Sequence, residues 1–547
     1  MTPRPWFAFL SKQSGAEMPF AIRIFLAALT GAGLSLSFTG FYLQIYSWVA
    51  IGLLLILVIG PRPRVAFACG FVHAIAFVLT SVPWIATVLS VHGGLSPAGG
   101  WAVLLLIASA WGVLIGGFTW CANRIAARDK TLACVAAPFL WVMFEFVRAH
   151  LPEISFPWNL LGYPAAGNSA LVQMTTITGI YGLSFLVAAF NALIAWADVG
   201  SKAQPLRKLG IVGFAAIVVL AVIFVGGKFV PSAEAKHAAR VVQPNFPEVE
   251  SYEPNWFAAH SEDMKDLEEL SLATSDKKPD LIVWPEAPAP FSWQDVNFAK
   301  LSSHIAIESQ RPFLMGTIEW KPEASPAGHT VQAPYNSAIV LDGQGQRIFS
   351  YDKMHLVPFG EYEPFPLIHR VVSSVSSEVG GFRKGTNRVV GTLPNGSEFG
   401  VYICYEAIYP GEIREFTEKG ANLLINISND GWFGKSAAAE QHLRMAAVRA
   451  AENRRWILRV TNSGITAAVD PYGRTYTLIP RDVRGAADLP YDFRTDLTLY
   501  AKFGDWFAWL CVIISVILVG QTFLKKQNSK TAKQRNSEIR KAKSERE

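Results

Sequence analysis

Three polar residues lie at the ends of apolar, strand-like segments, where side chains project from a rigid edge. They are Glu286 in "VWPEAP", Lys353 in "YDKMHLVPFGEYEP" and Cys404 in "ICYEAIYP". A cysteine thiolate attacks carbonyl carbon better than water does near neutral pH. A carboxylate can accept the thiol proton, and an ammonium group can stabilise the oxygen that becomes negative. These residue types together suit the transfer of an acyl group.

Cys404 is solitary, because the nearest cysteines along the chain, Cys134 and Cys511, both lie in long apolar segments. A lone cysteine is often a small hydrophobic core residue. The alternative depends on the compartment, since an exported domain would be expected to pair a structural cysteine in a disulfide. The polar domain around Cys404 offers no second cysteine. A free thiol there indicates retention for reactivity.

The elements around these residues alternate between strands and helices. A hairpin is predicted with its turn at Asp342–Gly345, where glycine permits the turn angles. A helix is predicted from Ser436 to Arg455, and the segment after it resumes as strand. This alternation indicates an α/β domain with a mixed sheet covered by helices. The predicted strands span residues 238–245, 280–287, 311–320, 335–353 (the hairpin), 399–406, 421–430 and 456–470.

The remainder of the 547-residue chain is apolar and nearly free of acidic residues over residues 20–230. A membrane-spanning helix needs about 20 mostly apolar residues. We predict eight spans, centred near residues 29, 52, 77, 111, 138, 184, 219 and 515. Glu145 and Arg148 lie at the end of the fifth. An intramembrane acid is costly unless it is paired or faces water, so Glu145 either has a role there or lies at the interface.

Basic residues in the short loops predict the orientation. Lys and Arg occur in the amino-terminal segment and in the second, fourth and sixth connections, whereas the first and third connections contain neither. Both termini are therefore expected in the cytoplasm, with the large polar domain outside, in the periplasm. The tail from Lys525 has nine Lys or Arg and three Glu, and this excess equals the net charge of +6 of the whole chain. Such a tail suits an anionic leaflet or is a disordered flank. Binding to nucleic acid has no other support.

The order Glu, Lys, Cys in these settings resembles the nitrilase, or carbon–nitrogen hydrolase, superfamily. With eight spans around the domain, residues 20–524 resemble the apolipoprotein N-acyltransferase family. The most specific segments are "HLVPFGEYEP", "ICYEAIYP", "INISNDGWFG", "QHLRMAAVRAAENRR" and "RVTNSGITAAVD", and in the membrane part "FPWNLLGY" also fits. The resemblance implies a nitrilase-like α-β-β-α sandwich domain inserted in an eight-helix transmembrane domain. The expected boundaries are 1–231 for seven helices, 232–503 for the catalytic domain, 504–524 for the eighth helix and 525–547 for the cytoplasmic tail.

The resemblance also implies residue roles. Cys404 would form a thioester with an acyl chain from a membrane phospholipid, with Glu286 as base and Lys353 beside the oxyanion. The acceptor would be the terminal amine of a diacylated apolipoprotein. Supporting roles are implied for Glu361, Asn336, Tyr405 and Glu406; the last can equally be a helix-initiating acid. An aromatic lid or lipid contact, or else ordinary packing of the loop against the domain, is predicted for Phe359, Tyr362, Phe365, Trp432 and Phe433.

One departure from the family pattern concerns a tryptophan after the first strand; Tyr252 and Trp256 are the two candidates for its place. No metal or cofactor is expected, because the ten histidines form no ligand motif and no Gly-rich phosphate loop precedes a helix. His355 and His442 are expected to be hydrogen-bonded structural groups. The predicted location is the inner membrane. Three alternatives stay open: an anchored amidase that uses water as acceptor, a transporter with an exported binding domain, and an inactive scaffold.

Overall fold

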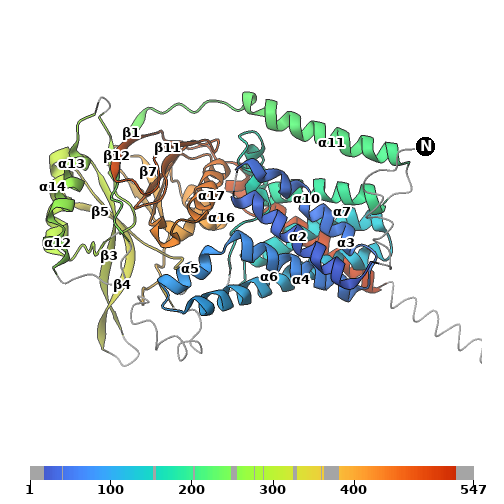
Figure 1. The fold of residues 1–547 in the computed structure, drawn as a ribbon. Coiled ribbons are helices and arrows are strands. Elements are labelled where there is room, and N and C mark those ends of the chain that lie inside the picture. Colours follow the sequence, from blue (N-terminus) through green and yellow to red (C-terminus); the bar gives the residue numbers. More distant parts are fainter. Residues whose placement is uncertain are drawn as a thin grey trace, which may run out of the picture.

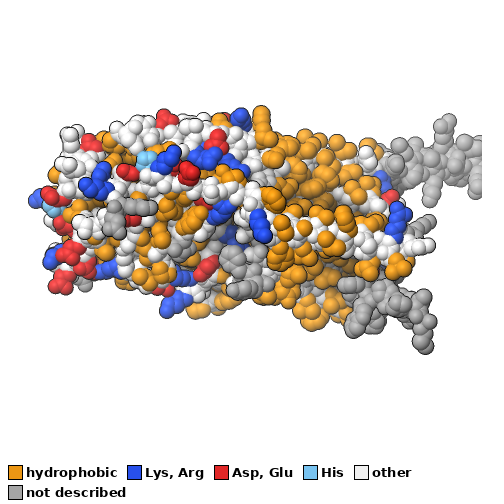
Figure 2. All heavy atoms as spheres, turned by 90° about the horizontal axis from the view of Figure 1, so that it is seen from above, with side chains coloured by type: hydrophobic (Ala, Val, Ile, Leu, Met, Phe, Trp, Pro, Cys, Tyr) orange, Lys and Arg blue, Asp and Glu red, His pale blue; other side chains and the backbone are white. Residues whose placement is uncertain are grey.

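The computed structural model has two parts that lie end to end: a helical bundle and a domain that contains two β-sheets (Figure 1). It describes residues 18–39, 41–151, 155–200, 204–247, 255–275, 278–287, 289–324, 329–358, 360–362 and 381–524. The predicted tail and the segment before residue 18 lie outside the described residues. Figure 2 shows hydrophobic side chains over the bundle and charged ones mainly over the sheets, which is the surface expected of a membrane domain with a polar head.

Apolar helices occupy all eight positions predicted to span the membrane, although the second is shorter than expected. Among the described residues, seven helices are long and apolar enough to cross a bilayer, whereas the second position holds the shorter helix Leu43–Val58. The long helices are α2 (Phe20–Thr39), α4 (Pro63–Ser81), α6 (Pro97–Ala126), α7 (Lys130–Ala149), α10 (Ile180–Ala195), α11 (Pro205–Val225) and the last helix, Trp506–Leu524. The shorter elements are η1 (Phe41–Trp48), α3 (Ala50–Val58), α5 (Trp84–Val91), α8 (Gly162–Ala165), η2 (Leu171–Met174), α9 (Thr175–Thr178), η3 (Trp196–Gly200) and η4 (Gly226–Phe229).

Small residues let neighbouring helices of the bundle approach closely. A Cβ atom on Gly31 of α2 would lie 2.0 Å from the backbone oxygen of His73 in α4, so no larger residue fits at that crossing. Close backbone approach of this kind replaces the hydrophobic driving force that is missing between helices in lipid. Helix α11 differs, since none of its residues is buried.

The other part contains two six-stranded sheets. The first has the order β12-β1-β2-β3-β4-β5 and the second the order β11-β10-β9-β8-β7-β6. The central strands pair in parallel and the outer strands antiparallel, as β1–β2 and β7–β8 against β3–β4 and β6–β7 illustrate. The strands are β1 (His237–Gln243), β2 (Leu281–Val283), β3 (Phe313–Ala324), β4 (Thr330–Leu341), β5 (Arg347–Asp352), β6 (Val390–Thr392), β7 (Glu398–Ile403), β8 (Leu423–Ser428), β9 (Ile457–Thr461), β10 (Thr466–Val469), β11 (Thr475–Ile479) and β12 (Gly485–Tyr491).

Alternating side chains make the sheets into the two middle layers of a sandwich. In β1, Val241 packs into the core shared by both sheets, whereas Val242 packs into the core under the outer helices. This is the period of two that a strand requires when both faces are buried. The outer helices are α12 (Trp256–Ala259), α13 (Ser261–Leu272) and α14 (Val296–Ser309); α16 (Pro410–Glu418) and α17 (Ala438–Asn453) cover the second sheet, with the short α18 (Leu499–Phe503) beside them. The result is an α-β-β-α sandwich.

Helix α17 and the turn η5 (Cys404–Ile408) lie at the junction of the two parts. Met445 and Val448 of α17, together with Tyr405 and Ile408 of η5, belong to the same hydrophobic core as the membrane helices. Gln441 of α17 donates to the backbone oxygens of Phe38 and Ser81, which end α2 and α4, at 3.2 Å each. The sandwich and the bundle therefore share one packed interface.

The predicted strand over residues 456–470 is wrong in one respect: it is two strands, β9 and β10, paired antiparallel. The chain turns back at Asn462–Ile465, where Gly464 is so close to Asp430 that a Cβ would lie 2.4 Å from its carboxylate. The hairpin predicted from 335 is also longer, because β4 pairs with β3 along its whole length from Thr330.

Candidate active site

The three residues predicted to be catalytic come together from both sheets. Glu286 follows β2, Lys353 directly follows β5, and Cys404 begins η5 directly after β7. All three are buried, with exposed fractions of 6%, 1% and 5%. Gly316 of β3 helps to place the first, because any Cβ there would lie 2.7 Å from the Cα of Glu286.

Lys353 lies between two carboxylates. Its Nζ atom is 3.1 Å from Glu286 Oε1 and 3.0 Å from Glu361 Oε1. Asn336 bridges the same two oxygens, since its Nδ2 donates to each at 2.7 Å. The remaining carboxylate oxygens accept from backbone N–H groups: Glu286 Oε2 from Asn429 at 2.8 Å, and Glu361 Oε2 from Val357 at 2.8 Å. The ammonium, the carboxylates and the amide thus form one buried, hydrogen-bonded unit.

The charges of this unit act on the thiol of Cys404. Burial opposes the charged form of Lys353, but the carboxylates of Glu286 and Glu361 outweigh it and raise the pKa of the ammonium above its usual range. Burial raises the pKa of Cys404 well above that of a free thiol, the carboxylate of Glu286 raises it further, and Lys353 lowers it. The resting sulfur is therefore a protonated thiol, and a nearby base must remove its proton for the sulfur to attack.

The backbone of Cys404 has a conformation that is unusual for a residue with a side chain. Its φ angle is +49°, in the left-handed region. This region brings Cβ close to the following carbonyl group, and such strain concentrates at functional sites. The angle occurs where β7 ends and the turn η5 begins. The strained backbone distinguishes Cys404 from the other residues at the end of β7, independently of the chemistry of its thiol.

Glu406 connects the turn η5, which begins at Cys404, to the segment that follows Lys353. One oxygen accepts from the backbone N–H of Ile403 at 2.7 Å. The other accepts from Met354 N at 2.7 Å, His355 N at 3.2 Å and Tyr351 Oη at 2.8 Å. Glu406 therefore both initiates the turn, as one interpretation predicted, and ties the turn to the residues that follow Lys353, which is a positioning role.

The segment "FPWNLLGY" lies against this turn from the membrane side. Phe156 stacks on Tyr405 at 6.3 Å between ring centroids, and Trp158 lies 5.6 Å from the ring of His442. Glu145 accepts from Leu161 N at 2.7 Å, and Arg148 donates to Trp158 O at 3.0 Å. Both charged residues are buried inside the protein rather than exposed at the membrane interface. Their hydrogen bonds hold the segment whose Phe156 stacks on Tyr405 of η5.

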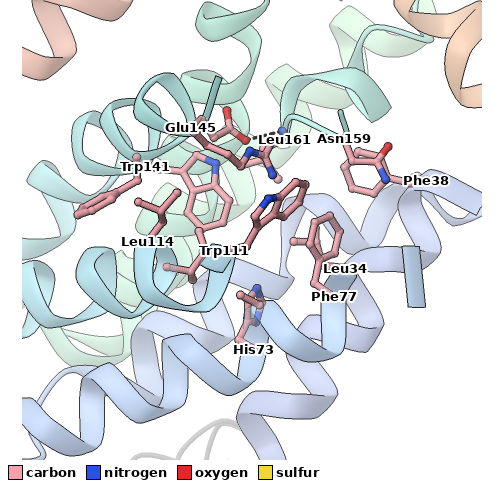
Figure 3. Close-up of a pocket in the computed structure, with 14 residues that line it drawn as sticks. Leu34, Phe38, His73, Phe77, Trp111, Leu114, Trp141, Glu145, Asn159 and Leu161 are labelled. Atoms are coloured by element: carbon pink, nitrogen blue, oxygen red, sulfur yellow. Dashed lines mark hydrogen bonds between the residues drawn. The ribbon is translucent and has the colours of Figure 1, made fainter. Parts of the chain in front are cut away.

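A pocket opens between the helices beside this segment (Figure 3). Glu145 and the bonded Leu161 lie at one side of the pocket, and His73 lies across it. The guanidinium of Arg148 lies 3.8 Å from the ring centroid of Trp111. Apolar and aromatic side chains form most of the lining, among them Leu34, Phe38, Phe77, Leu114 and Trp141.

The residues predicted to form a lid are only partly described. Phe359 and Phe365 lie outside the described residues, as does Tyr252. The ring of Tyr362 lies 4.6 Å from the Lys384 ammonium, and Trp432 is 41% exposed with its ring 4.7 Å from that of His92. Phe433 packs on Trp84 of α5 and on Trp158, with ring centroids 4.9 and 5.9 Å apart. The lid stays a prediction.

Trp256, one candidate for the place of the family tryptophan, is buried beside Phe246 and His260 in the core under the outer helices.

Sequence reasoning missed several polar residues behind Cys404. Asp430 and Arg459 form a fully buried ion pair at 2.6 Å, and His442 touches both. Their signal was present in "ISNDGWFG" and "RVTNSG", which were recognised as segments but not given roles residue by residue. Within the described ranges, no group of three or more His, Cys, Asp or Glu is arranged to hold a metal ion.

Comparisons with known proteins agree with this architecture. The family model described as "Carbon-nitrogen hydrolase" matches residues 238–489, and "Apolipoprotein N-acyltransferase N-terminal domain" matches residues 30–193. An apolipoprotein N-acyltransferase of Geobacter metallireducens is 30% identical over 92% of this chain and 95% of its own length. One of Brucella melitensis is 31% identical over 78% of this chain and 80% of its own. An amidase structure from Nesterenkonia sp. covers 50% of this chain and 94% of its own at 16% identity, with a TM-score of 0.35. The two family models and the similar acyltransferases confirm the resemblance and the nitrilase-like fold class predicted from sequence.

Proposed function

This chain belongs to the apolipoprotein N-acyltransferase family, and from that premise we propose that it transfers a fatty acyl chain from a membrane phospholipid to the terminal amine of diacylated apolipoproteins. The family makes it a multi-pass membrane acyltransferase. The donor, the thioester intermediate and the residues that act belong to the proposal. We propose the inner membrane as its location, with the sandwich domain in the periplasm and both termini in the cytoplasm.

The observation that carries the proposal is the position of Cys404. The turn that begins at Cys404 packs into the core of the membrane bundle through Tyr405 and Ile408. The charges of Glu286 and Lys353 act on the pKa of its thiol. We infer from this position that a lipid acyl chain reaches the thiol without leaving the bilayer. Extracting the chain into water would cost about 0.8 kcal/mol per buried methylene.

In the first half-reaction the thiol attacks the ester carbonyl of the phospholipid. Glu286 accepts the thiol proton as the carbon–sulfur bond forms. The carbonyl oxygen becomes negative beside Lys353, whose buried ammonium is held charged by its two carboxylates. The carbon–oxygen bond to glycerol then breaks, and Glu286 passes its proton to that oxygen. The products are a lysophospholipid and a thioester on Cys404.

In the second half-reaction the amine of the apolipoprotein attacks the thioester. Glu286 removes a proton from the attacking nitrogen, and the sulfur leaves and is reprotonated. Since the first product departs before the second substrate reacts, ping-pong kinetics follow. Glu361 accepts a hydrogen bond from the Lys353 ammonium, and Asn336 donates to the carboxylates of Glu286 and Glu361. These contacts would keep Lys353 and Glu286 in place between the two steps.

The acceptor distinguishes this function from the anchored amidase. The protein in detergent with phospholipid labelled in its acyl chains should convert a synthetic diacylglyceryl-cysteine peptide to the labelled amide, and should release little free fatty acid. Release of free acid at the same rate with and without peptide would make water the acceptor and overturn the proposal. The matches to acyltransferases give no support to the transporter alternative. An inactive scaffold predicts neither product.

A further inference from the structure

The strained backbone of Cys404 needs something to hold it. A non-glycine residue at φ +49° relaxes towards the right-handed regions unless neighbouring groups fix the adjacent peptide. The carbonyl oxygen of Cys404 lies 3.0 Å from Nε2 of His442. His442 is fully buried on α17, thirty-eight residues further along the chain. This contact acts on the backbone of the nucleophile and not on its sulfur.

The surroundings of His442 determine which ring nitrogen carries the proton. Burial and the nearby charge of Arg459 lower the pKa of His442, so the ring is neutral and has one N–H. Nε2 faces the Cys404 carbonyl, which can only accept. Nδ1 lies 3.1 Å from Nη2 of Arg459, which can only donate. The proton therefore sits on Nε2, and Nδ1 accepts from the guanidinium.

Asp430 completes the arrangement. Its Oδ2 accepts from Arg459 at 2.6 Å, so the aspartate fixes the same guanidinium nitrogen that donates to His442. Its Oδ1 accepts from Ser428 Oγ at 2.8 Å and also lies 3.1 Å from Nδ1 of the ring. A proton on Nδ1 could pair with that oxygen, but it would face the Arg459 guanidinium and leave the Cys404 carbonyl without a donor, so the Nε2–H tautomer leaves fewer groups unpaired. Burial disfavours the charged form of Asp430, but the charge of Arg459 outweighs it and holds the pKa of Asp430 far below the usual range. The ion pair is thus internally neutral, and it locks the ring in one tautomer.

We propose that His442 is a positioning residue for Cys404, donating from Nε2 to the Cys404 carbonyl and holding the nucleophile in its left-handed conformation. The inference rests on the proposed role of Cys404. It also excludes a role for His442 as the base of a Cys–His pair, because both ring nitrogens are engaged away from the sulfur. The neighbouring Gln441 accepts from Trp158 Nε1 at 2.7 Å, so the same turn of α17 links the nucleophile to the membrane segment.

The test compares two polar substitutions that differ in reach. The terminal amide nitrogen of glutamine can take the place of Nε2, whereas that of asparagine reaches only about as far as Nδ1. In the full-length protein, we expect H442Q to alkylate at Cys404 with iodoacetamide within about 3-fold of the wild-type rate, and H442N at least 10-fold more slowly. Peptide mapping separates Cys404 from the other four cysteines, and the thermal midpoint of each variant reports its folding.

Equal alkylation rates in H442N and wild type would overturn the proposal, and so would equal slowing in both variants. If H442N fails to fold, H442Q and wild type still decide: restored reactivity in H442Q supports the hydrogen bond, and a 10-fold loss contradicts it. Acylation by phospholipid is measured in parallel. A wild-type thiol that alkylates but is never acylated would defeat the proposed function, while the alkylation rates would still decide the role of His442.

Discussion

Replacing Lys353 by methionine would remove the positive charge from a buried site that holds two carboxylates. Methionine has nearly the length of lysine, so the change tests charge more than packing. The ammonium is 1% exposed and contacts Glu286 and Glu361 at 3.1 and 3.0 Å. After the substitution, Asn336 is the remaining donor that bridges Glu286 Oε1 and Glu361 Oε1.

Breaking a buried ion pair from one side costs about 3–5 kcal/mol, because the partner charge stays buried without compensation. For the sandwich domain, a loss of 1 kcal/mol in the free energy of unfolding corresponds to about 2–4 °C of thermal midpoint, so we expect the midpoint to fall by about 6–20 °C. The wild-type contribution is constant between pH 5 and 8, since the raised pKa of Lys353 keeps the ammonium charged throughout. In the variant, the two carboxylates stay buried without the cation that pairs with them, and Asn336 still donates to both.

Thermal unfolding of the purified protein near neutral pH, followed by tryptophan fluorescence, measures this loss. The matched control is K321M, which removes a partly exposed lysine of β3 that pairs with Asp352 of β5 at 2.6 Å and with Glu319 at 3.4 Å; its cost should stay below about 1 kcal/mol. The double variant K353M/E361Q, which also removes one of the two carboxylate charges, should recover part of the loss. A loss of stability in K353M no larger than that in K321M would contradict the expected cost.

Three further predictions concern the same site. Glu406→Ala leaves four donors without an acceptor and should cost about 2–4 kcal/mol of stability while slowing alkylation of Cys404, measured by thermal unfolding and peptide mapping. Alkylation of wild-type Cys404 should still be accelerating between pH 8 and 10, because burial raises the thiol pKa; a plateau near pH 8.5 would contradict this. The double variant W432A/F433A should lose turnover of phospholipid more than alkylation by a water-soluble reagent, and equal losses would argue against a lipid-contact role.

The positions of strands and of strand-end residues could be predicted from sequence, because alternation and turn formers are local signals. Glu286, Lys353 and Cys404 stood out for that reason, each placed at the end of an apolar run. The strands β6, β11 and β12 lie at sheet edges, and their alternation of apolar and polar residues is too weak to predict them from sequence. The β9–β10 turn was missed because the apolar segment continues on both sides of "NSG".

The contacts that organise the site could not be predicted, because they join residues far apart in the chain. Asn336 donates to Glu286 across fifty positions, and His442 reaches Cys404 across thirty-eight. Such pairs depend on how the two sheets and α17 are packed, which no local pattern specifies. The burial of Glu145 inside the bundle, rather than at the interface, depends likewise on packing against Leu161.

If an acyl chain is carried on the sulfur of residue 404, mass mapping of the protein after incubation with one defined phospholipid and no acceptor should find it there. We expect one acyl group on Cys404, sensitive to hydroxylamine, absent in C404S and discharged when a diacylated peptide is added. Acylation of the peptide by C404S, or by wild type with no acyl group ever found at Cys404, would contradict it.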